Sequence, residues 1–398
     1  MKILIVDHGI EDIGGVTNAL INLLRGIVSE EGFDLSLLLF DKTSCTSAIP
    51  EGVRLRRPPY LPSIWFAPRK KLGFLDKICW YLLHGVARLV GESFVWKIMI
   101  AVSSFDDDHY DVAIAYENDL PEANVLLGTN DYVVKRVKSS KKIAYVHNDP
   151  CRLGFTYDYM LKRYRLFDGV IGVSKACADK LIDICPDYAQ KVQVARNFAG
   201  REAMPPKNMR TLMRPRIVSV GRLDNKQKRI DRIIDCCAEL KSCEFGSFVW
   251  DVYGSGPDKE KLEKYARRRA VDDVLKFKGV TKDAVATIRH YDLFVLASDY
   301  EAYPLVLLEA RSAGTVVLCT DFEEAYESVI DGKTGFIVPK DASEMANIII
   351  ELFEHPDTLF AMERFAGVMP VDDSEAKRQF FEVVGFPDDD RLRQLEES

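Results

Sequence analysis

The chain has 398 residues, of which 47% are hydrophobic and 10% aromatic, and its formal net charge is −7. This length allows two domains of ordinary size, and the composition is that of a folded protein, which excludes a largely disordered chain. The acidic balance also argues against general nucleic-acid binding.

The cysteines and the first residues bear on location. The nine cysteines are odd in number and lack metal-site spacing, which is typical of reduced thiols in a cytoplasmic protein. The opening MKILIVDHG has an apolar run that ends at Asp7, too short for the core of a signal peptide. We therefore expect a first strand here and a cytoplasmic protein.

The N-terminal stretch predicts a strand, a loop and a helix. KILIV is the strand, the loop runs to Gly15, and VTNALINLLRGIV has the period of a helix, an order that opens a doubly wound α/β fold. Gly14 and Gly15 stand just before the helix, where free backbone N–H groups and the helix dipole favour a phosphate or a sugar. The GxGxxG fingerprint is absent, and a plain turn is the alternative.

The region at about 60–105 breaks the strand pattern. It holds three of the four tryptophans, together with basic residues such as Arg69–Lys71 and Lys77. Its longest charge-free stretch, from Lys77 to Arg88, is too short to span a bilayer. Basic side chains interleaved with Trp and Leu favour a helix lying on an anionic membrane surface. The alternative is a helical insertion packed on its own domain.

Two further predicted strands end in polar residues. DVAIAYE ends at Glu117, and KKIAYVHNDP ends in His147, Asn148 and Asp149. The carboxyl edge of a parallel sheet is where ligands bind, so His147 is a candidate functional residue, although a lone histidine is more often structural. DGVIGVSKACADKLI then predicts a strand and a helix with Ser174 as its N-cap.

A stretch without periodicity, rich in proline, methionine and charge, divides the chain from Phe198 to Arg214. We expect one domain over 1–199, a linker over 200–214 and a second domain over 215–370. An acidic tail follows over 371–398, with a return to the N-terminal domain as one of its options.

The second domain repeats the strand, loop and helix plan. Two of its predicted strand-to-helix turns contain glycines, and together with the loop described next they would gather at one edge of the sheet. That edge is expected to form a pocket for a phosphorylated ligand. The residues of the two turns are Gly221, Arg222, Lys228, Gly254 and Gly256.

The stretch Leu296–Leu318 carries two carboxylates, Glu301 and Glu309. The preceding HYDLFVLAS predicts a buried strand, so Ser298–Tyr303 is the loop at its carboxyl end. With Pro304 in the first helical turn, Glu301 lies in the loop and Glu309 projects from the second turn, so both can point into one cleft. The alternative is a buried helix with two incidental glutamates.

Taken together, these motifs resemble retaining glycosyltransferases of the GT-B fold, family 4 (glycosyl transferases group 1). The run from IAYVHNDP to DGVIGVSKA is similar to members that act in capsular or cell-wall polysaccharide assembly. The resemblance implies two Rossmann-like doubly wound domains facing a central cleft, the first for the acceptor and the second for a nucleotide-sugar donor. The matching stretches are Gly14-Gly15-Val16, Val173-Ser174, Val220-Gly221-Arg222-Leu223, Gly254-Ser255-Gly256-Pro257, the Glu301/Glu309 pair and Gly332-Lys333-Thr334-Gly335-Phe336.

The resemblance also implies roles in the second domain. Arg222 and Lys228 would hold the donor diphosphate, beside the turn of Gly221, Gly254 and Gly256. Glu309 would bind the nucleotide ribose and Glu301 the hydroxyls of the donor sugar. Backbone N–H groups around Tyr303, Pro304 and Leu305 would help. Since fixed cations stabilise the charge that develops on the leaving diphosphate, no metal is expected.

In the first domain, the resemblance implies that Gly14 and Gly15 let the diphosphate or acceptor approach. His147 would lie near the donor sugar in a positioning role, with no covalent step. The chain departs from the family at Asp321-Phe322-Glu323-Glu324, where a Gly-Gly pair is common, and these acids would oppose phosphate by like charge. Asp106–Asp108 and Asp388–Asp390 mimic a metal-binding motif of the other glycosyltransferase fold, but we expect neither to bind metal.

The function implied is transfer of a hexose from a UDP- or GDP-linked donor to a saccharide acceptor. That acceptor is expected to be lipid-linked, and the enzyme to be peripheral on the inner face of the cell membrane. The alternative is a catalytically silent relative that binds nucleotide-sugar or lipid as an assembly subunit. A Rossmann dehydrogenase is disfavoured because GxGxxG is absent.

Overall fold

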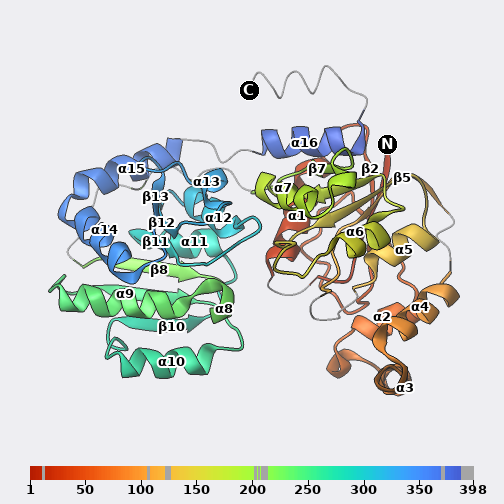
Figure 1. Ribbon diagram of the computed structural model, residues 1–398, viewed down its shortest axis with the longest axis horizontal. Helices are drawn as coiled ribbons and strands as arrows, with labels where there is room; N and C mark the ends of the chain where they lie inside the picture. The colour runs from red at the N-terminus through yellow and green to blue at the C-terminus, as the bar shows by residue number, and fades with distance from the viewer. Residues whose placement is uncertain are drawn as a thin grey trace. The chain divides into compact units, whose positions relative to one another are not determined.

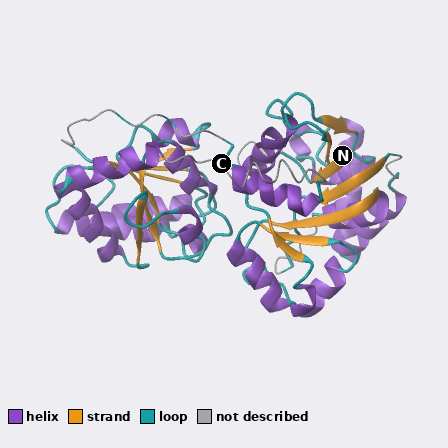
Figure 2. Ribbon diagram, turned by 90° about the horizontal axis from the view of Figure 1, so that it is seen from above, coloured by secondary structure: helices purple, strands orange, loops and turns teal. Residues whose placement is uncertain are grey.

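The chain folds into two α/β units, seen in a computed structural model that describes residues 1–10, 14–104, 108–121, 127–200, 204, 207, 214–368 and 373–386. The first unit contains Met1–Gly200 and the C-terminal segment from Asp373, and the second unit lies between them in the chain (Figure 1). Helices flank the strands of each unit (Figure 2). The expected two-domain α/β architecture is confirmed.

The first unit is built on a seven-stranded parallel sheet in the order β3-β2-β1-β4-β5-β6-β7. Five of the six residues of the first strand are buried, as expected for a parallel sheet covered on both faces. The strands are β1 (Lys2–Asp7), β2 (Asp34–Leu39), β3 (Arg54–Arg56), β4 (His109–Ala115), β5 (Lys138–Val146), β6 (Gly169–Gly172) and β7 (Val192–Val194). The covering helices include α1 (Gly15–Val28), α5 (Thr129–Arg136), α6 (Tyr157–Tyr164) and α7 (Lys175–Ile184), and a 3₁₀ turn η2 (Pro186–Tyr188) follows α7.

A helical insertion separates β3 from β4, as predicted. Its elements are α2 (Tyr60–Phe66), the 3₁₀ turn η1 (Arg69–Lys71), α3 (Phe74–Val90) and α4 (Glu92–Val102). Trp96 of α4 is 1% exposed and packs against Phe40 and Phe66, so α4 joins the main core of the unit. Helix α3 differs, because Ala87 is its one buried residue. The insertion therefore packs on its own domain through α2 and α4 and leaves α3 largely outside.

The second unit is built on a six-stranded parallel sheet in the order β10-β9-β8-β11-β12-β13. Its core contains the fully buried Trp250, whose indole N–H donates to Ser219 Oγ at 3.1 Å. The strands are β8 (Arg216–Val220), β9 (Val249–Tyr253), β10 (Leu275–Gly279), β11 (Leu293–Leu296), β12 (Val316–Thr320) and β13 (Gly335–Val338). The helices are α8 (Asn225–Lys228), α9 (Ile230–Ser242), α10 (Lys259–Arg268), α11 (Ala284–Ile288), α12 (Leu305–Ser312), α13 (Ala325–Ser328), α14 (Ala342–Glu354) and α15 (Pro356–Val368).

The C-terminal helix α16 (Ser374–Val384) packs on the first unit. Phe33 has its ring centroid 5.3 Å from that of Phe381, and Lys377 forms an ion pair with Glu30 at 2.8 Å. Most of the predicted linker over 200–214 lies outside the described residues. Of its described members, Lys207 pairs with Glu363 of α15 at 3.2 Å and so attaches to the second unit.

Candidate functional site

The carboxyl ends of β8, β9, β11 and β12 meet at one edge of the second sheet, because all these strands run parallel. The loops that follow them carry most of the residues predicted for the donor site. Open α/β sheets bind ligands at this edge. The candidate site is therefore formed by these loops.

Lys228 and Glu301 meet at the centre of this edge. Lys228 Nζ lies 2.5 Å from Glu301 Oε1, and Ser298 Oγ donates to the same oxygen at 2.6 Å. Gln227 Nε2 donates to the other oxygen at 3.1 Å. Glu301 is 6% exposed, and a buried carboxylate of this kind requires such partners. The ammonium of Lys228 is thus held in place by the carboxylate predicted to act beside it.

Arg229 and Arg232 fix this pair, although the sequence did not single them out. Arg229 adopts φ 47° and ψ 50° between α8 and α9, a left-handed conformation that is uncommon for a side chain of its size. Asp299 accepts from Arg229 NH1 at 3.0 Å and from Arg232 NH2 at 2.7 Å. Burial opposes ionisation of Asp299, but the two guanidinium groups hold the pKa of that carboxyl below its usual value. The two hydrogen bonds of Asp299 with Arg229 and Arg232 therefore join the loop that holds Glu301 to the end of the helix that holds Lys228.

The glycine turn after β9 packs directly against the loop after β8. A Cβ at Gly254 would lie 1.8 Å from the carbonyl oxygen of Gly221, and one at Gly256 would lie 2.4 Å from that of Leu223. The N–H of Gly221 donates to Tyr253 and that of Gly254 to Gly279. Gly254 and Gly256 therefore allow the loop after β9 to approach the loop after β8 closely. The N–H groups of Gly221 and Gly254 form hydrogen bonds within the unit.

Arg222 projects from the loop after β8 and is exposed. No hydrogen bond or ion pair connects its guanidinium to the part of the chain that the structure describes. Helix α12 begins at Leu305, one residue later than predicted, and places Glu309 half-buried in its second turn. Pro304 is the N-cap, and the N–H of Leu305 donates to the carbonyl of Tyr303 at 2.9 Å.

The acidic segment after β12 lies at the same edge. Asp321 and Glu323 are exposed, whereas Glu324 is 1% exposed. Two of the three acids are therefore exposed at this edge.

His147 follows β5 at the carboxyl edge of the first sheet. It is 7% exposed, and its ring centroid lies 4.4 Å from that of Tyr116 and 5.5 Å from that of Tyr145. Its backbone N–H donates to Asn118 Oδ1 at 2.9 Å. Burial lowers the pKa of His147 to about 4, against the opposing influence of Asp7, so the ring is neutral at neutral pH. A neutral buried imidazole suits a positioning role better than that of an acid.

A second histidine at this edge was missed. His8 Nδ1 contacts a carboxylate oxygen of Glu117 and lies 3.5 Å from Asp7 Oδ1. Burial would lower its pKa, but the hydrogen bonds with Asp7 and Glu117 outweigh burial and raise it to about 11. The ligand atoms of the three residues lie within 4.8 Å of one another, a spacing that could also hold a metal ion. A protonated Nδ1 competes with metal, since a ligand must be deprotonated.

The remaining predicted residues are the glycines before α1, the N-cap of α7 and the two runs of aspartates. Gly14 is the extended N-cap of α1, and a Cβ at Gly15 would meet no atom of the described residues within 4 Å. Ser174 caps α7 as predicted, its Oγ accepting from the N–H of Cys177. Asp108 pairs with Arg56 at 2.9 Å. Asp106, Asp107 and Asp388–Asp390 lie outside the described residues.

Comparison with known proteins places this site in a family context. Residues 200–366, which make up most of the second unit, match the family model of glycosyl transferases group 1. The chain is 25% identical over 220 residues to the lipopolysaccharide core biosynthesis glycosyltransferase LpsE of Rhizobium meliloti, covering 54% of this chain and 60% of the relative. It is 28% identical over 261 residues to the amylovoran biosynthesis glycosyltransferase AmsK of Erwinia amylovora, covering 61% of this chain and 60% of the relative. The matches thus span about three fifths of these relatives.

The fold is also that of solved glycosyltransferases. The structure of Anabaena Alr3699/HepE in complex with UDP and glucose superposes with a TM-score of 0.63 and 18% identity, covering 100% of this chain and 98% of that chain. This likeness shows the GT-B fold that the motifs predicted.

Proposed function

We propose that the chain is a retaining glycosyltransferase that moves a hexose from a nucleotide-diphosphate sugar to a saccharide acceptor in polysaccharide or glycolipid assembly. The observation that carries the proposal is the Lys228–Glu301 pair at the carboxyl edge of the second sheet, inside the segment matched by the group 1 model. Arg222 lies in the loop after β8 at the same edge. LpsE and AmsK are named as biosynthesis glycosyltransferases, and HepE was solved with UDP and glucose.

The chemistry follows from the side chains. Breaking the bond between sugar and diphosphate leaves negative charge on the diphosphate, and Arg222 and Lys228 are the cations that would stabilise it. Glu301 would accept hydrogen bonds from hydroxyls of the donor sugar, and Glu309 would bind the ribose of a UDP- or GDP-linked donor. With these fixed cations, the reaction needs no metal.

The first unit would receive the acceptor, which we propose to be lipid-linked and reached at the inner face of the cell membrane. His147 would position the donor sugar as a neutral ring. No helix formed by the described residues has the length and hydropathy to cross a bilayer.

A catalytically silent relative is the second candidate, and the exposed Asp321 and Glu323 favour it. By like charge these acids would oppose the further negative charge that develops on the leaving diphosphate, and so would slow turnover more than binding. The two candidates differ in turnover and not in binding, so both measurements are needed.

The test is a thermal-stability screen with UDP- and GDP-linked sugars, each followed by a turnover assay. A ligand at 100 times its dissociation constant adds about 2.7 kcal/mol to the free energy of unfolding. We expect one donor to raise the melting temperature of the wild type and to do so far less for Arg222→Ala. A donor that stabilises without turnover in the presence of candidate acceptors would support the silent relative, and no stabilisation by any donor would contradict both.

A further inference from the structure

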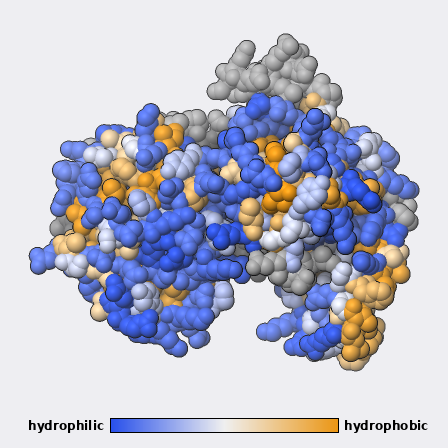
Figure 3. Space-filling view, viewed as in Figure 1, coloured by the Kyte–Doolittle hydropathy of each residue, from blue (hydrophilic) through white to orange (hydrophobic). Residues whose placement is uncertain are grey.

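Eleven of the eighteen large apolar side chains exposed in the described chain lie on α3 and α4, and we call the surface that they form the outer face. Figure 3 shows apolar side chains gathered at this part of the first unit. Large exposed apolar patches mark protein or membrane contacts. On α3 its residues are Phe74, Leu75, Ile78, Tyr81, Leu82, Val86, Leu89 and Val90, and on α4 they are Phe94, Ile98 and Val102.

Several of the exposed apolar side chains of α3 lie on one side of the helix. At about 100° per residue, Ile78, Leu82 and Leu89 point within roughly 40° of one another. Ala87, the buried residue of α3, points about 160° away from the middle of that group. Helix α3 is therefore apolar on two sides, one packed on its domain and one facing outward.

The inner side of α3 is well fixed. His84 is stacked between the rings of Trp80 and Trp65, with centroid separations of 3.8 and 4.3 Å. Its Nδ1 also lies 2.9 Å from the carbonyl of Trp80. The outer face is thus presented by an anchored helix and is not a result of loose packing.

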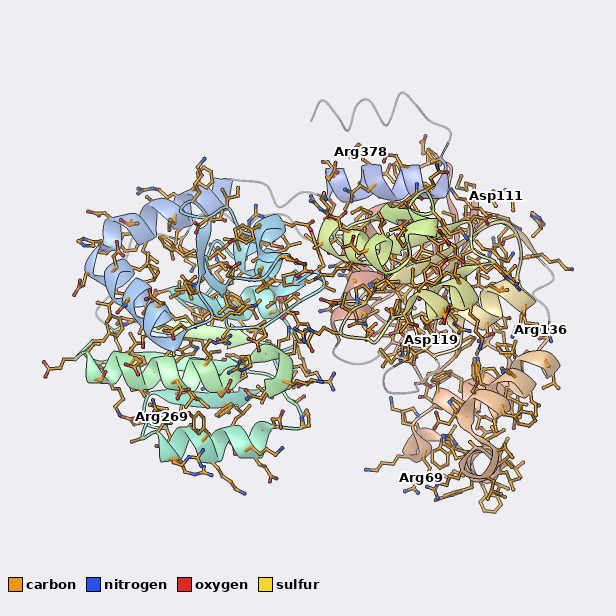
Figure 4. The ribbon with its side chains drawn as sticks, in the orientation of Figure 1. Arg69, Asp111, Asp119, Arg136, Arg269 and Arg378 are labelled. Atoms are coloured by element: carbon orange, nitrogen blue, oxygen red, sulfur yellow. The ribbon has the colours of Figure 1, made fainter. Side chains whose placement is uncertain are left out.

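Positive charge borders the outer face. Arg69, Lys70 and Lys71 of η1 are all exposed, and Figure 4 labels Arg69 at this end of the insertion. Arg69 NH1 donates to the hydroxyl of Tyr81 at 2.7 Å, which ties η1 to α3. The acid of α3, Asp76, is engaged by Lys42 and Tyr60, and these hydrogen bonds lower its pKa. The surface that Arg69, Lys70 and Lys71 form is therefore basic, although the whole chain has a net charge of −7.

We infer that the outer face enters the headgroup region of an anionic bilayer, with α3 lying in the plane of the surface. Apolar side chains bordered by arginine and lysine are what such an interface requires. A second copy of the chain fits less well, because a two-fold pair would place the same cations of η1 opposite or near one another. This contact would bring a lipid-linked acceptor within reach of the enzyme, and only that purpose rests on the proposed function.

The test is sedimentation of the full chain with vesicles of neutral phosphatidylcholine and with vesicles that also contain phosphatidylglycerol. We expect binding to the anionic vesicles that weakens as salt is added. Leu82→Ser combined with Leu89→Ser should weaken it at least tenfold. Leu166→Ser is the matched control, an exposed leucine of the same unit outside the insertion, and should bind as the wild type does.

A charge variant separates the two parts of the interaction. Changing Arg69, Lys70, Lys71 and Lys77 to Ser should weaken binding to anionic vesicles by about fivefold for each cation that lies near the surface. It should also remove most of the dependence on salt. Each variant is first checked for an unchanged melting temperature.

Three outcomes would overturn the inference. They are no binding of the wild type to anionic vesicles at low salt, wild-type binding by the double leucine variant, and a dimer seen by light scattering that the same leucine variant abolishes. Donor stabilisation is measured without vesicles, so the two proposals fail separately. Vesicle binding with no response to any nucleotide sugar would contradict the proposed function alone.

Discussion

At the scale of single residues, the buried histidine of the first sheet tests the electrostatic account. The pKa of His147 is about 4 in the folded chain, below the value of about 6.5 for a free histidine. Between these two values the unfolded chain binds a proton that the folded chain does not. Stability from this site is therefore complete above pH 6.5 and is lost as the pH falls toward 4.

The prediction compares the wild type with His147→Phe, which keeps a ring between Tyr116 and Tyr145. From pH 7 to pH 5 the wild type should lose about 2 kcal/mol of unfolding free energy more than the variant does. Urea unfolding at several pH values measures the difference. Parallel curves for the two proteins would show that His147 protonates freely in the folded chain.

A second residue-scale prediction concerns Gly15, predicted from the sequence to permit close approach of a ligand. Since a Cβ there meets no atom of the described residues within 4 Å, Gly15→Ala should leave the melting temperature unchanged or slightly raised. Turnover of the donor should nevertheless fall if a phosphate or sugar lies against this backbone.

The matched control is Gly85→Ala, another helical glycine with open space around it. It lies in α3, which holds none of the residues assigned to the site, and should keep full turnover in an assay without vesicles. Equal turnover for the wild type and both variants would mean that Gly14 and Gly15 form only the turn into α1.

At the scale of elements, the glycine turn after β9 sets the position of the loop after β8. A Cβ at Gly256 would lie within 2.7 Å of three backbone atoms of Leu223, so Gly256→Ala must displace the loop that carries Arg222. We expect a loss of about 1–3 kcal/mol in stability, as for other overpacked sites, together with weaker donor binding.

Ser255→Ala is the control, because Ser255 is exposed and lies in the same turn. Its effect should stay within about 0.5 kcal/mol. If Gly256→Ala keeps both stability and donor binding, the close contact between the two loops does not support the site.

The elements also show how far the sequence could be interpreted. Period and glycine placement predicted the strands, the helices and the turns that hold Lys228 and Glu301, since these are local patterns. The pairing of Asp299 with Arg229 joins residues 70 positions apart and depends on the pairing of β8 with β11, which no local period encodes. The bridge from His8 to Glu117 was missed for the same reason, because it requires β1 and β4 to be neighbours.

At the scale of the whole molecule, one prediction concerns metal. The proposed cations of the donor site make a metal unnecessary, whereas the separate group of Asp7, His8 and Glu117 has a spacing that could hold one. We expect turnover to survive exhaustive treatment with chelator, since a protonated His8 already bridges the two carboxylates. Activity lost in chelator and restored by Mg²⁺ or Mn²⁺ would contradict this.

The most direct test of the central claim is the release of nucleoside diphosphate from the donor that stabilises the chain, measured for the wild type, Lys228→Ala and Lys226→Ala. Lys226 is an exposed lysine two positions away on the same short helix and serves as the control. By analogy with loss of one oxyanion donor, Lys228→Ala should lower turnover by about 10²–10³-fold, while Lys226→Ala should retain it. Turnover by Lys228→Ala at the wild-type rate would contradict the assignment of this edge as the donor site.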